Sequence, residues 1–357
     1  MKTRILILGA SYGSLIATKL LMAGHHVTLV CTRGTAELIN REGTVVRFPM
    51  KGWQGLLQVP SAVLPGVLDA CAPESAEPES YDLVILGMQD AQYGERSVRE
   101  LMERIARSRK PCLAIMNMPP PPYLKRVSAL ADADLRQCYT DPAVWDGFEP
   151  GLVSLASPDP QAFRPQGEPK NVLQVGLPTN FKAARFEAEA PTALLRDLAA
   201  DIENARFAGK SELELPVKLK VHDSLFVPMA KWPMLITGNY RCIRPQEMIA
   251  IREAVHGNLE RSREVYNWVA NLCMRLGAAA TDLVPFEKYA KAAEGLARPS
   301  SAARALFGGA PHIERVDSLV HCIADRLGAH SAPLREIVRL VDDRLEKNRL
   351  AGEPVAA

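Results

Sequence analysis

The first part of the chain alternates short apolar runs with stretches of helical spacing. Residues 4–8 and 26–31 are largely apolar runs, the pattern expected of strands that are buried on both faces. A turn over residues 9–14 separates the first run from apolar residues at helical spacing, and Gly24 closes that stretch. A strand, a glycine turn, a helix and a strand within about 30 residues make a βαβ unit.

Two further apolar runs continue this alternation. One covers residues 83–86, and the other, at 112–116, follows a basic stretch of helical spacing over 98–109. Repeated βα units with short buried strands predict a parallel, doubly wound sheet.

The segment between Pro111 and Pro178 is rich in proline and includes four consecutive prolines at 119–122. Helices are not expected there, because proline removes a backbone donor and clashes with the preceding turn. Extended pieces at 152–155 and 172–175 predict strands appended to the same sheet.

From Pro191 onward the apolar residues adopt helical spacing. We predict helices over 194–202, 227–240, 246–276, 312–327 and 333–345, with Ser331 capping the last one. The chain therefore divides into an α/β domain over 1–218 and a helical domain over 219–357, with the boundary after the polar segment 209–214.

The composition excludes several classes of protein. Of 357 residues, 47% are hydrophobic and 24% charged, which is typical of a folded globular protein. Lys and Arg number 43 and Asp and Glu 41, so the net charge of +2 argues against a broad basic groove for nucleic acid. No apolar run approaches the ~20 residues of a membrane span. We expect neither a nucleic-acid nor a membrane partner.

The cysteines indicate a reducing compartment. Seven cysteines are scattered along the chain, and no two form a Cys-x-x-Cys pair. Disulfide frameworks and zinc sites use paired spacings, so we expect free thiols, no bound metal and a cytoplasmic location.

The turn after the first predicted strand stands where a dinucleotide-binding fingerprint belongs. It consists of Gly9, Ala10, Ser11, Tyr12, Gly13 and Ser14. Glycines let the backbone approach a pyrophosphate, and the following helix offers free N–H groups and the positive end of its dipole. Ser11 replaces the second glycine of the usual pattern. The alternative is a plain tight turn in a fold that has lost its cofactor.

The end of the second predicted strand indicates which nucleotide is bound. NAD-binding proteins place an acidic residue there to hold the ribose 2′-hydroxyl. This chain has Thr32 and Arg33 instead. A guanidinium suits bidentate contact with phosphate, so we expect both residues to hold the 2′-phosphate of NADP(H). The alternative is that Arg33 is a solvated loop residue.

Four segments, at 83–92, 115–117, 231–239 and 298–317, carry polar residues in a pattern typical of one family. Together with the turn at Gly9, they make the whole chain resemble the ketopantoate reductase (2-dehydropantoate 2-reductase) family, as a divergent member. The resemblance implies an α/β Rossmann-type N-terminal domain plus an all-α C-terminal domain, the two-domain architecture of 6-phosphogluconate dehydrogenase. It also implies a homodimer.

The first two segments supply cofactor contacts according to this resemblance. Gln89 stands where the family has a lysine that helps hold the cofactor phosphate, and Gln92 matches a family glutamine. Asn117 matches the asparagine that lies at the nicotinamide and the substrate. Asn117 at a strand end also fits a simple turn former.

The last two segments supply the chemistry of the reaction according to the resemblance. Lys231 falls on the catalytic lysine and Glu314 on the catalytic-site glutamate, while Asn239 and Ser301 fall on substrate-binding positions. Leu235 replaces the first asparagine of the family's helix. On a regular helix, positions separated by eight residues stay on one side, so Lys231 and Asn239 can face the same way.

The implied reaction is NADPH-dependent reduction of a 2-oxo acid, ketopantoate or a related compound, to the 2-hydroxy acid. Lys231 would act as the general acid that protonates the carbonyl oxygen. Each of these residues also has a structural interpretation: a surface lysine, a solvated glutamate and a helix-capping serine. Two other functions remain open, another NAD(P)-dependent dehydrogenase of the opine or hydroxy-acid type and a catalytically degenerate nucleotide-binding protein.

Overall fold

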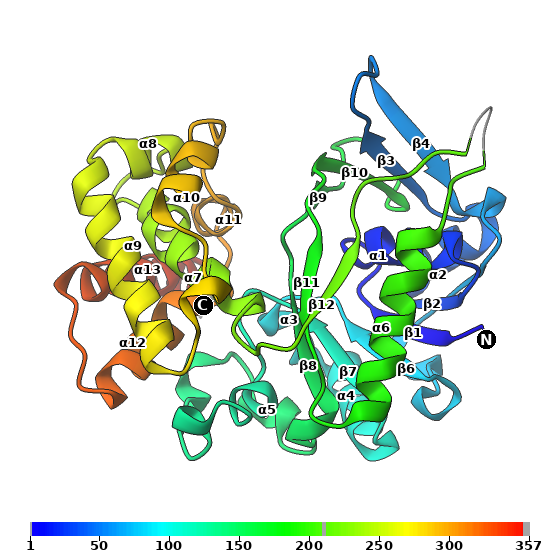
Figure 1. Cartoon of the computed structure of the whole chain (residues 1–357), viewed down its shortest axis with the longest axis horizontal. Coiled ribbons are helices and arrows are strands. Elements are labelled where there is room, and N and C mark those ends of the chain that lie inside the picture. Colours follow the sequence, from blue (N-terminus) through cyan, green and yellow to red (C-terminus); the bar gives the residue numbers. More distant parts are fainter. Residues whose placement is uncertain (1, 209–211, 353–357) are drawn as a thin grey trace, which may run out of the picture. The chain divides into compact units, whose positions relative to one another are not determined.

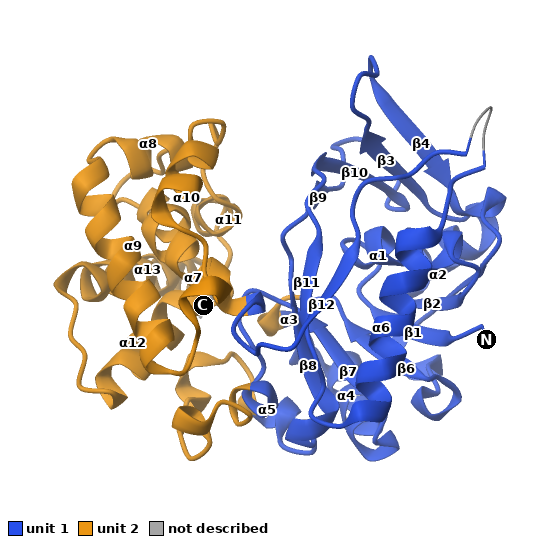
Figure 2. Ribbon diagram, viewed as in Figure 1, with its two compact units in different colours: residues 1–88, 92–123, 143–228 blue, residues 89–91, 124–142, 229–357 orange. Residues whose placement is uncertain are grey.

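The computed structural model describes residues 2–208 and 212–352, and the chain divides into two compact units (Figure 2). Unit 1 is formed by residues 1–88, 92–123 and 143–228, and unit 2 by residues 89–91, 124–142 and 229–357. No helix among the described residues combines the length and the apolarity needed to cross a membrane.

Unit 1 contains an eight-stranded sheet with the strand order of a dinucleotide-binding fold (Figure 1). The strands lie in the order β12-β11-β8-β7-β6-β1-β2-β5, and all pairs from β5 to β8 are parallel. This part of the sheet has the order third, second, first, fourth, fifth, sixth, which is that of doubly wound dinucleotide-binding sheets. The bounds are β1 Arg4–Leu8, β2 His26–Val30, β5 Val67–Cys71, β6 Leu83–Leu86, β7 Cys112–Ile115, β8 Val153–Ser157, β11 Phe181–Ala184 and β12 Leu219–His222. The predicted doubly wound sheet is therefore confirmed.

Among the described residues, five α-helices lie wholly or mainly in unit 1. They are α1 Gly13–Met22, α2 Arg33–Glu42, α4 Arg96–Ser108, α5 Pro121–Leu124 and α6 Glu189–Asn204. Helix α5 corrects the expectation that the proline-rich segment has no helix. It is a single turn with Pro121 and Pro122 at its first two positions, where proline is tolerated because the N–H groups have no intrahelical partner.

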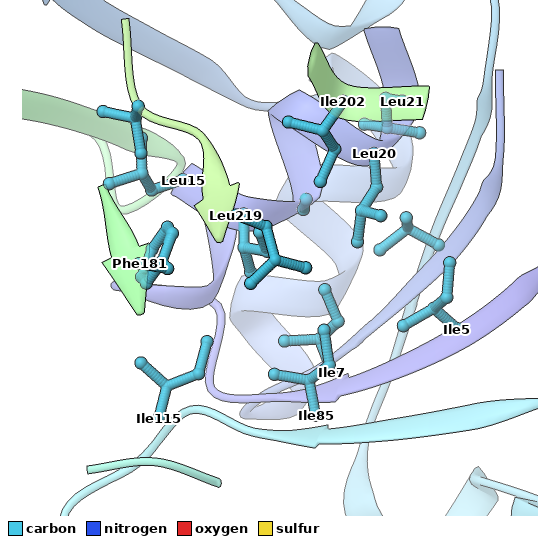
Figure 3. Close-up of a cluster of buried hydrophobic side chains, with 14 of the residues drawn as sticks. Ile5, Ile7, Leu15, Leu20, Leu21, Ile85, Ile115, Phe181, Ile202 and Leu219 are labelled. Carbon is cyan, nitrogen blue, oxygen red and sulfur yellow. The ribbon is translucent and has the colours of Figure 1, made fainter. Parts of the chain in front are cut away.

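The core of unit 1 is an apolar layer between α1, α6 and one face of the sheet (Figure 3). Every residue of α1 is buried, and Leu195, Leu198 and Ile202 bury the apolar face of α6 in the same cluster. The predicted helix at 194–202 therefore belongs to the α/β unit. After α6 the chain forms β12, which pairs with β11 in the main sheet. The last segment of unit 1 therefore ends at residue 228, whereas the sequence predicted a boundary near 218.

A second, four-stranded sheet in the order β4-β3-β10-β9 also belongs to unit 1. Its strands are β3 Val45–Pro49, β4 Leu56–Pro60, β9 Gln161–Phe163 and β10 Val172–Leu177. The strand predicted at 172–175 exists, but the expectation that it extends the main sheet is wrong. Its backbone pairs with β3 in parallel register, which joins segments more than a hundred residues apart in the chain.

Unit 2 is helical. Its helices are α7 Trp232–Met234, α8 Ile251–His256, α9 Leu259–Arg275, α10 Phe286–Ala293, α11 Ser301–Phe307, α12 Val316–Arg326 and α13 Ala332–Gly352, and the short α3 Asp90–Tyr93 has residues in both units. The helix predicted over 246–276 is divided into α8 and α9 because Asn258 caps α9, accepting a hydrogen bond from the Arg261 N–H at 2.9 Å. Ser331 caps α13 as predicted, with 3.3 Å between its hydroxyl and the Leu334 nitrogen.

Lys19 is the largest charged side chain in the core of unit 1. Only 1% of it is exposed, and its ammonium donates to the carbonyl oxygens of Leu215 at 3.0 Å and Pro216 at 3.4 Å. Burial lowers the pKa of Lys19 to about 8, with the Lys218 charge acting in the same direction. This lysine therefore links α1 to the segment that leads into β12.

We expect Gly66→Ala to lower the free energy of unfolding by about 2–3 kcal/mol, as overpacking does. A Cβ at Gly66 would lie 2.4 Å from the His25 carbonyl oxygen and 2.8 Å from the Leu21 backbone. Gly34→Ala is the matched control, because nothing lies within 4 Å of its Cβ position in the first turn of α2. Alanine there should stabilise by about 0.5–1 kcal/mol. Urea unfolding checks both variants, and equal stability of the two would contradict the packing described.

We expect the stability difference between wild type and Lys19→Met to depend on pH. The pKa of Lys19 is lower in the folded chain, so between about pH 8 and 10.5 the unfolded chain binds more protons and the wild type gains stability as pH rises. The gain relative to Lys19→Met should be about 3 kcal/mol. Urea unfolding at a series of pH values measures it, and a difference that stays constant across this range would contradict the burial of a charged Lys19.

Candidate functional site

The turn between β1 and α1 is held close to the end of β6. Gly9 has a φ of +98°, and a Cβ there would lie 2.8 Å from Met88 Cγ and 2.9 Å from the Gly87 carbonyl oxygen. The Gly9 N–H donates to the Val30 carbonyl, and the Gly87 N–H donates to the Leu8 carbonyl, both at 2.9 Å. Glycine is required at position 9 both by the backbone conformation and by the close approach.

This turn presents backbone donors at the start of a buried helix. In the described part of the chain, the N–H groups of Ala10, Ser11 and Tyr12 have no hydrogen-bond partner. The Ser14 hydroxyl donates back to the Ala10 carbonyl at 2.5 Å, and the first turn of α1 carries no acidic residue. Free N–H groups and the positive end of the helix dipole together suit a phosphate. Of the six predicted residues, Gly9 to Tyr12 form the turn, and Gly13 and Ser14 are the first two residues of α1.

The side chain of Tyr12 points away from this turn's donors. Its hydroxyl donates to the Pro160 carbonyl at 2.6 Å, and its ring packs edge-on against Phe181 with the centroids 5.8 Å apart. Burial raises the pKa of Tyr12 and keeps the phenol neutral. We therefore expect Tyr12 to contact a bound phosphate through its backbone alone. Its side chain connects the start of α1 to Pro160, directly before β9.

The end of β2 carries the two predicted phosphate residues. Thr32 precedes α2, and Arg33 is the first residue of that helix instead of a loop residue. Both side chains are exposed. The Thr32 hydroxyl donates to the Thr35 hydroxyl at 3.0 Å. An exposed arginine in the first turn of a helix can reach an anion bound at the end of the neighbouring strand.

Arg164, directly after β9, was missed by the sequence analysis. Its positive charge acts on the thiol of Cys31, at the end of β2, and opposes the burial that raises the pKa of Cys31 to about 11. The Nε atom of Arg164 is buried and has no hydrogen-bond partner among the described residues. Only the pairing of β9 in the second sheet brings residue 164 near residue 31, so no local sequence signal could have identified it.

The remaining predicted cofactor residues follow β6 and β7. Asn117 is half-buried just beyond the carboxyl end of β7, which pairs in parallel with β6, so it lies at the same sheet edge as Gly87. Gln89 and Gln92 are exposed, on either side of the start of α3. Gln92 and Asn117 belong to unit 1 and Gln89 to unit 2.

In unit 2, the segment from Lys231 to Asn239 is helical but not regular. It passes from a 3₁₀ turn, Pro228–Lys231, through α7 into a π-helical turn, Leu235–Asn239. The regular helix assumed for residues 231–239 is therefore wrong, and its angle of about 100° per residue does not apply across the π-helical turn. Both side chains are half-buried, and Leu235 is buried. Helical π turns occur frequently at functional sites.

Ser300 connects this helical segment to α11. Its hydroxyl donates to the Asn239 carbonyl at 2.7 Å and accepts a hydrogen bond from the Ala303 N–H at 3.1 Å, which caps α11. Ser300 is almost fully buried, whereas the predicted Ser301 is exposed as the first residue of α11. The structure therefore places the predicted pair Asn239 and Ser301 in adjacent segments.

Glu314 lies in the loop that precedes α12. Its backbone carbonyl accepts a hydrogen bond from the Tyr240 hydroxyl at 2.5 Å, and the same hydroxyl accepts from the Val316 N–H at 3.0 Å. Tyr240 follows Asn239 directly, so this bond brings Glu314 close to the end of the π-helical turn. In unit 2, Asn239, Ser301 and Glu314 thus belong to segments joined by direct hydrogen bonds.

An ion pair anchors the loop of Glu314. Arg315 contacts the carboxylate of Asp317 at 3.0 Å and that of Asp342 at 2.7 Å. Asp317 is fully buried, which raises its pKa, and the Arg315 charge opposes this increase. Among the described residues, no group of three or more His, Cys, Asp or Glu side chains could hold a metal ion.

Comparison with known proteins supports the two-domain fold. No family model and no curated protein matches the sequence. Among solved structures, 2-dehydropantoate 2-reductase from Methylococcus capsulatus is 12% identical, with 99% of this chain and 98% of that chain covered and a TM-score of 0.68. A dimeric ketopantoate reductase from Staphylococcus aureus is 10% identical, with coverages of 97% and 99% and a TM-score of 0.61.

A third similar structure is a complex of D-mandelate dehydrogenase with NADH. It is 13% identical, with 96% of this chain and 99% of that chain covered and a TM-score of 0.60. At these identities the likeness concerns the fold, and it extends over nearly the full length of the chains. The chain therefore has the fold of the ketopantoate reductases, a Rossmann-type α/β domain followed by a helical domain.

Proposed function

We propose that this protein is an oxidoreductase that reduces a 2-oxo acid, ketopantoate or a related compound, to the 2-hydroxy acid with NADPH. One observation carries the proposal. The turn after β1, with Gly9 in a left-handed conformation, presents the free N–H groups of Ala10, Ser11 and Tyr12 at the start of α1. This turn follows β1, a strand of the sheet that has the strand order of dinucleotide-binding proteins.

The residues of unit 1 fit a nicotinamide dinucleotide. Gly9, Ala10, Ser11, Tyr12, Gly13 and Ser14 would hold the pyrophosphate through backbone N–H groups and the dipole of α1. Asn117, Gln89 and Gln92 are further candidates for cofactor contacts, and Asn117 lies at the carboxyl edge of the sheet, where ligands bind in this fold. When bound, the cofactor supplies the hydride that is transferred to the carbonyl carbon of the substrate.

The end of β2 favours NADP(H) over NAD(H). No acidic residue stands there to accept a hydrogen bond from a ribose 2′-hydroxyl. Thr32, Arg33 and Arg164 provide hydroxyl and guanidinium donors instead, and the buried Nε of Arg164 lacks a partner within the described residues. Guanidinium groups bind phosphate through paired hydrogen bonds.

Unit 2 supplies the proposed catalytic group. As the carbonyl oxygen of the substrate gains negative charge, Lys231 would donate a proton to it. Asn239 and Ser301 would bind the substrate carboxylate and its neighbouring polar groups, and Glu314 would accept a hydrogen bond from a substrate hydroxyl or orient Lys231. We further propose a cytoplasmic homodimer that acts on a small molecule and binds neither nucleic acid nor a membrane.

One observation favours a second candidate, a dehydrogenase of an apolar 2-hydroxy acid. Leu235 is buried in the π-helical turn between Lys231 and Asn239, where the sequence resemblance implies an asparagine. A leucine there offers no hydrogen bond to a polar substrate. The similarity in fold to D-mandelate dehydrogenase points in the same direction. A panel of 2-oxo acids with polar and apolar side chains separates the two candidates by their kcat/KM values.

We expect Arg33→Ala to weaken NADPH binding by roughly 10- to 100-fold and NADH binding by less than threefold. The loss corresponds to about 1.5–3 kcal/mol for a charge-assisted hydrogen bond to phosphate. Fluorescence titration with each nucleotide measures it, and Lys170→Ala, which removes an exposed charge, is the control. An equal loss for both nucleotides would exclude a role for Arg33 at the 2′-phosphate.

We expect Lys231→Ala to lower kcat for 2-oxo acid reduction by roughly 10²–10⁴-fold, the range for removing a general acid. NADPH binding should be unchanged, because the proposed pyrophosphate site lies in unit 1. Lys288→Ala, an exposed lysine of α10, is the matched control. NADPH oxidation at saturating substrate provides the measurement, and full activity of Lys231→Ala would remove Lys231 from the mechanism.

A further inference from the structure

Two thiols from distant parts of the sequence meet in unit 2. Cys138 ends the 3₁₀ turn Arg136–Cys138, and Cys322 lies on α12. The two thiols lie close enough for each to shift the pKa of the other. Cys138 is buried and Cys322 is partly exposed, so Cys322 is the more accessible residue of the two.

Neighbouring side chains fix the position of both sulfur atoms. The Ser318 hydroxyl, one turn before Cys322 on α12, donates to Cys138 Sγ at 3.9 Å. The Gln137 amide donates to Cys322 Sγ at 3.6 Å. Residues four apart on a helix lie on one face, so Cys138 packs against the face of α12 that carries Ser318 and Cys322. The 3₁₀ turn that carries Cys138 therefore packs against the part of α12 that carries Cys322, which brings the two thiols to one contact.

The surroundings of Cys138 and Cys322 shift the pKa values of the two thiols in opposite directions. The hydrogen bond with Cys138, followed by contributions from Gln137 and His321, lowers the pKa of Cys322 to about 6. The same hydrogen bond, together with burial, raises the pKa of Cys138, which the charge of Arg315 opposes. Cys322 is therefore the member of the pair that loses its proton more readily, and Cys138 the member that keeps it. The thiolate is the nucleophilic form of cysteine.

The chain contains a second pair of neighbouring cysteines, Cys31 and Cys71, whose pKa values are shifted differently from that of Cys322. Cys31 and Cys71 lie at the ends of the paired strands β2 and β5, where the Cys31 N–H donates to the Cys71 carbonyl at 3.0 Å. Burial raises the pKa of both thiols, that of Cys31 to about 11. Both side chains are partly exposed, as Cys322 is, so the difference between the pairs is electrostatic and not one of access.

We propose that Cys322 and Cys138 form a thiol–disulfide exchange site for low-molecular-weight disulfides. The Cys322 thiolate attacks one sulfur of the small disulfide, breaks its S–S bond and releases one thiolate. Cys138 then loses its proton and attacks the Cys322 sulfur of this mixed disulfide, which forms the Cys138–Cys322 bond and releases the second thiolate. The protein loses two electrons and the proton of Cys138. The two released thiolates become thiols by taking up that proton and one more from solvent.

This bond would fasten the segment 124–142 to α12 within unit 2. The segment belongs to unit 2 although the chain on both sides of it, at 92–123 and 143–228, belongs to unit 1. The side chains of Gln137 and Cys138 already contact α12 without a covalent link. The proposal is independent of the nucleotide and of the reaction proposed above.

The test uses the full-length protein in buffers with increasing ratios of oxidised to reduced glutathione. After rapid blocking of free thiols, mass spectrometry of the digested protein identifies the cross-linked peptides. We expect a Cys138–Cys322 link that dithiothreitol reverses, and no link between Cys31 and Cys71. In Cys138→Ser, glutathione should remain attached to Cys322, because the resolving thiol is missing. In Cys322→Ser, Cys138 should remain unmodified.

A second readout on the wild-type protein does not depend on the folding of a variant. The rate of Cys322 alkylation should reach half its maximum near pH 6, whereas an unperturbed thiol does so near pH 8.5. Absence of the Cys138–Cys322 link at every glutathione ratio would overturn the proposal. Attachment of glutathione to Cys31 or Cys71 in preference to Cys322 would overturn it as well.

Discussion

The close approach of the β1–α1 turn to the end of β6 is the constraint on which the proposed site depends. Gly9 can adopt its φ of +98° and pass the Gly87 carbonyl because it carries no side chain. Gly13 is also constrained, since a Cβ there would lie 2.8 Å from the side-chain Cγ2 of Ile7. This packing places the start of α1 at the carboxyl edge of the sheet, and there the backbone N–H groups of residues 10–12 become available to a phosphate.

The parts of the fold that depend on local sequence were predictable. The buried strands β1, β2, β6, β7 and β8 are short apolar runs, and α1 and α4 have helical spacing between turn residues. The second sheet was not predictable, because β3 and β4 are only partly buried and β3 pairs with β10 across a long stretch of chain. Arg164 was missed for the same reason, since its position near Cys31 depends on that sheet.

In unit 2 as well, the sequence predicted some features of the site and not others. The resemblance pointed to the region around Lys231, Asn239, Ser301 and Glu314, and hydrogen bonds through Ser300 and Tyr240 bring three of these segments together. The helix changes from 3₁₀ to α to π geometry between residues 228 and 239, and this change could not be predicted from the spacing of apolar residues in the sequence. Trp232, Ile236 and Gly238 are buried in this segment, so its geometry forms in contact with the rest of unit 2.

The central claim is that a nicotinamide dinucleotide binds on the turn after β1. Hydrogen–deuterium exchange of the full chain with and without NADPH tests it most directly, because the amides of Ala10, Ser11 and Tyr12 have no partner among the described residues. The account predicts that saturating NADPH slows exchange of the peptide containing these amides, and that 5′-AMP, which lacks the pyrophosphate, slows it far less. Bound NADPH that leaves exchange at residues 9–14 unchanged, or failure of NADPH to bind, would contradict the account.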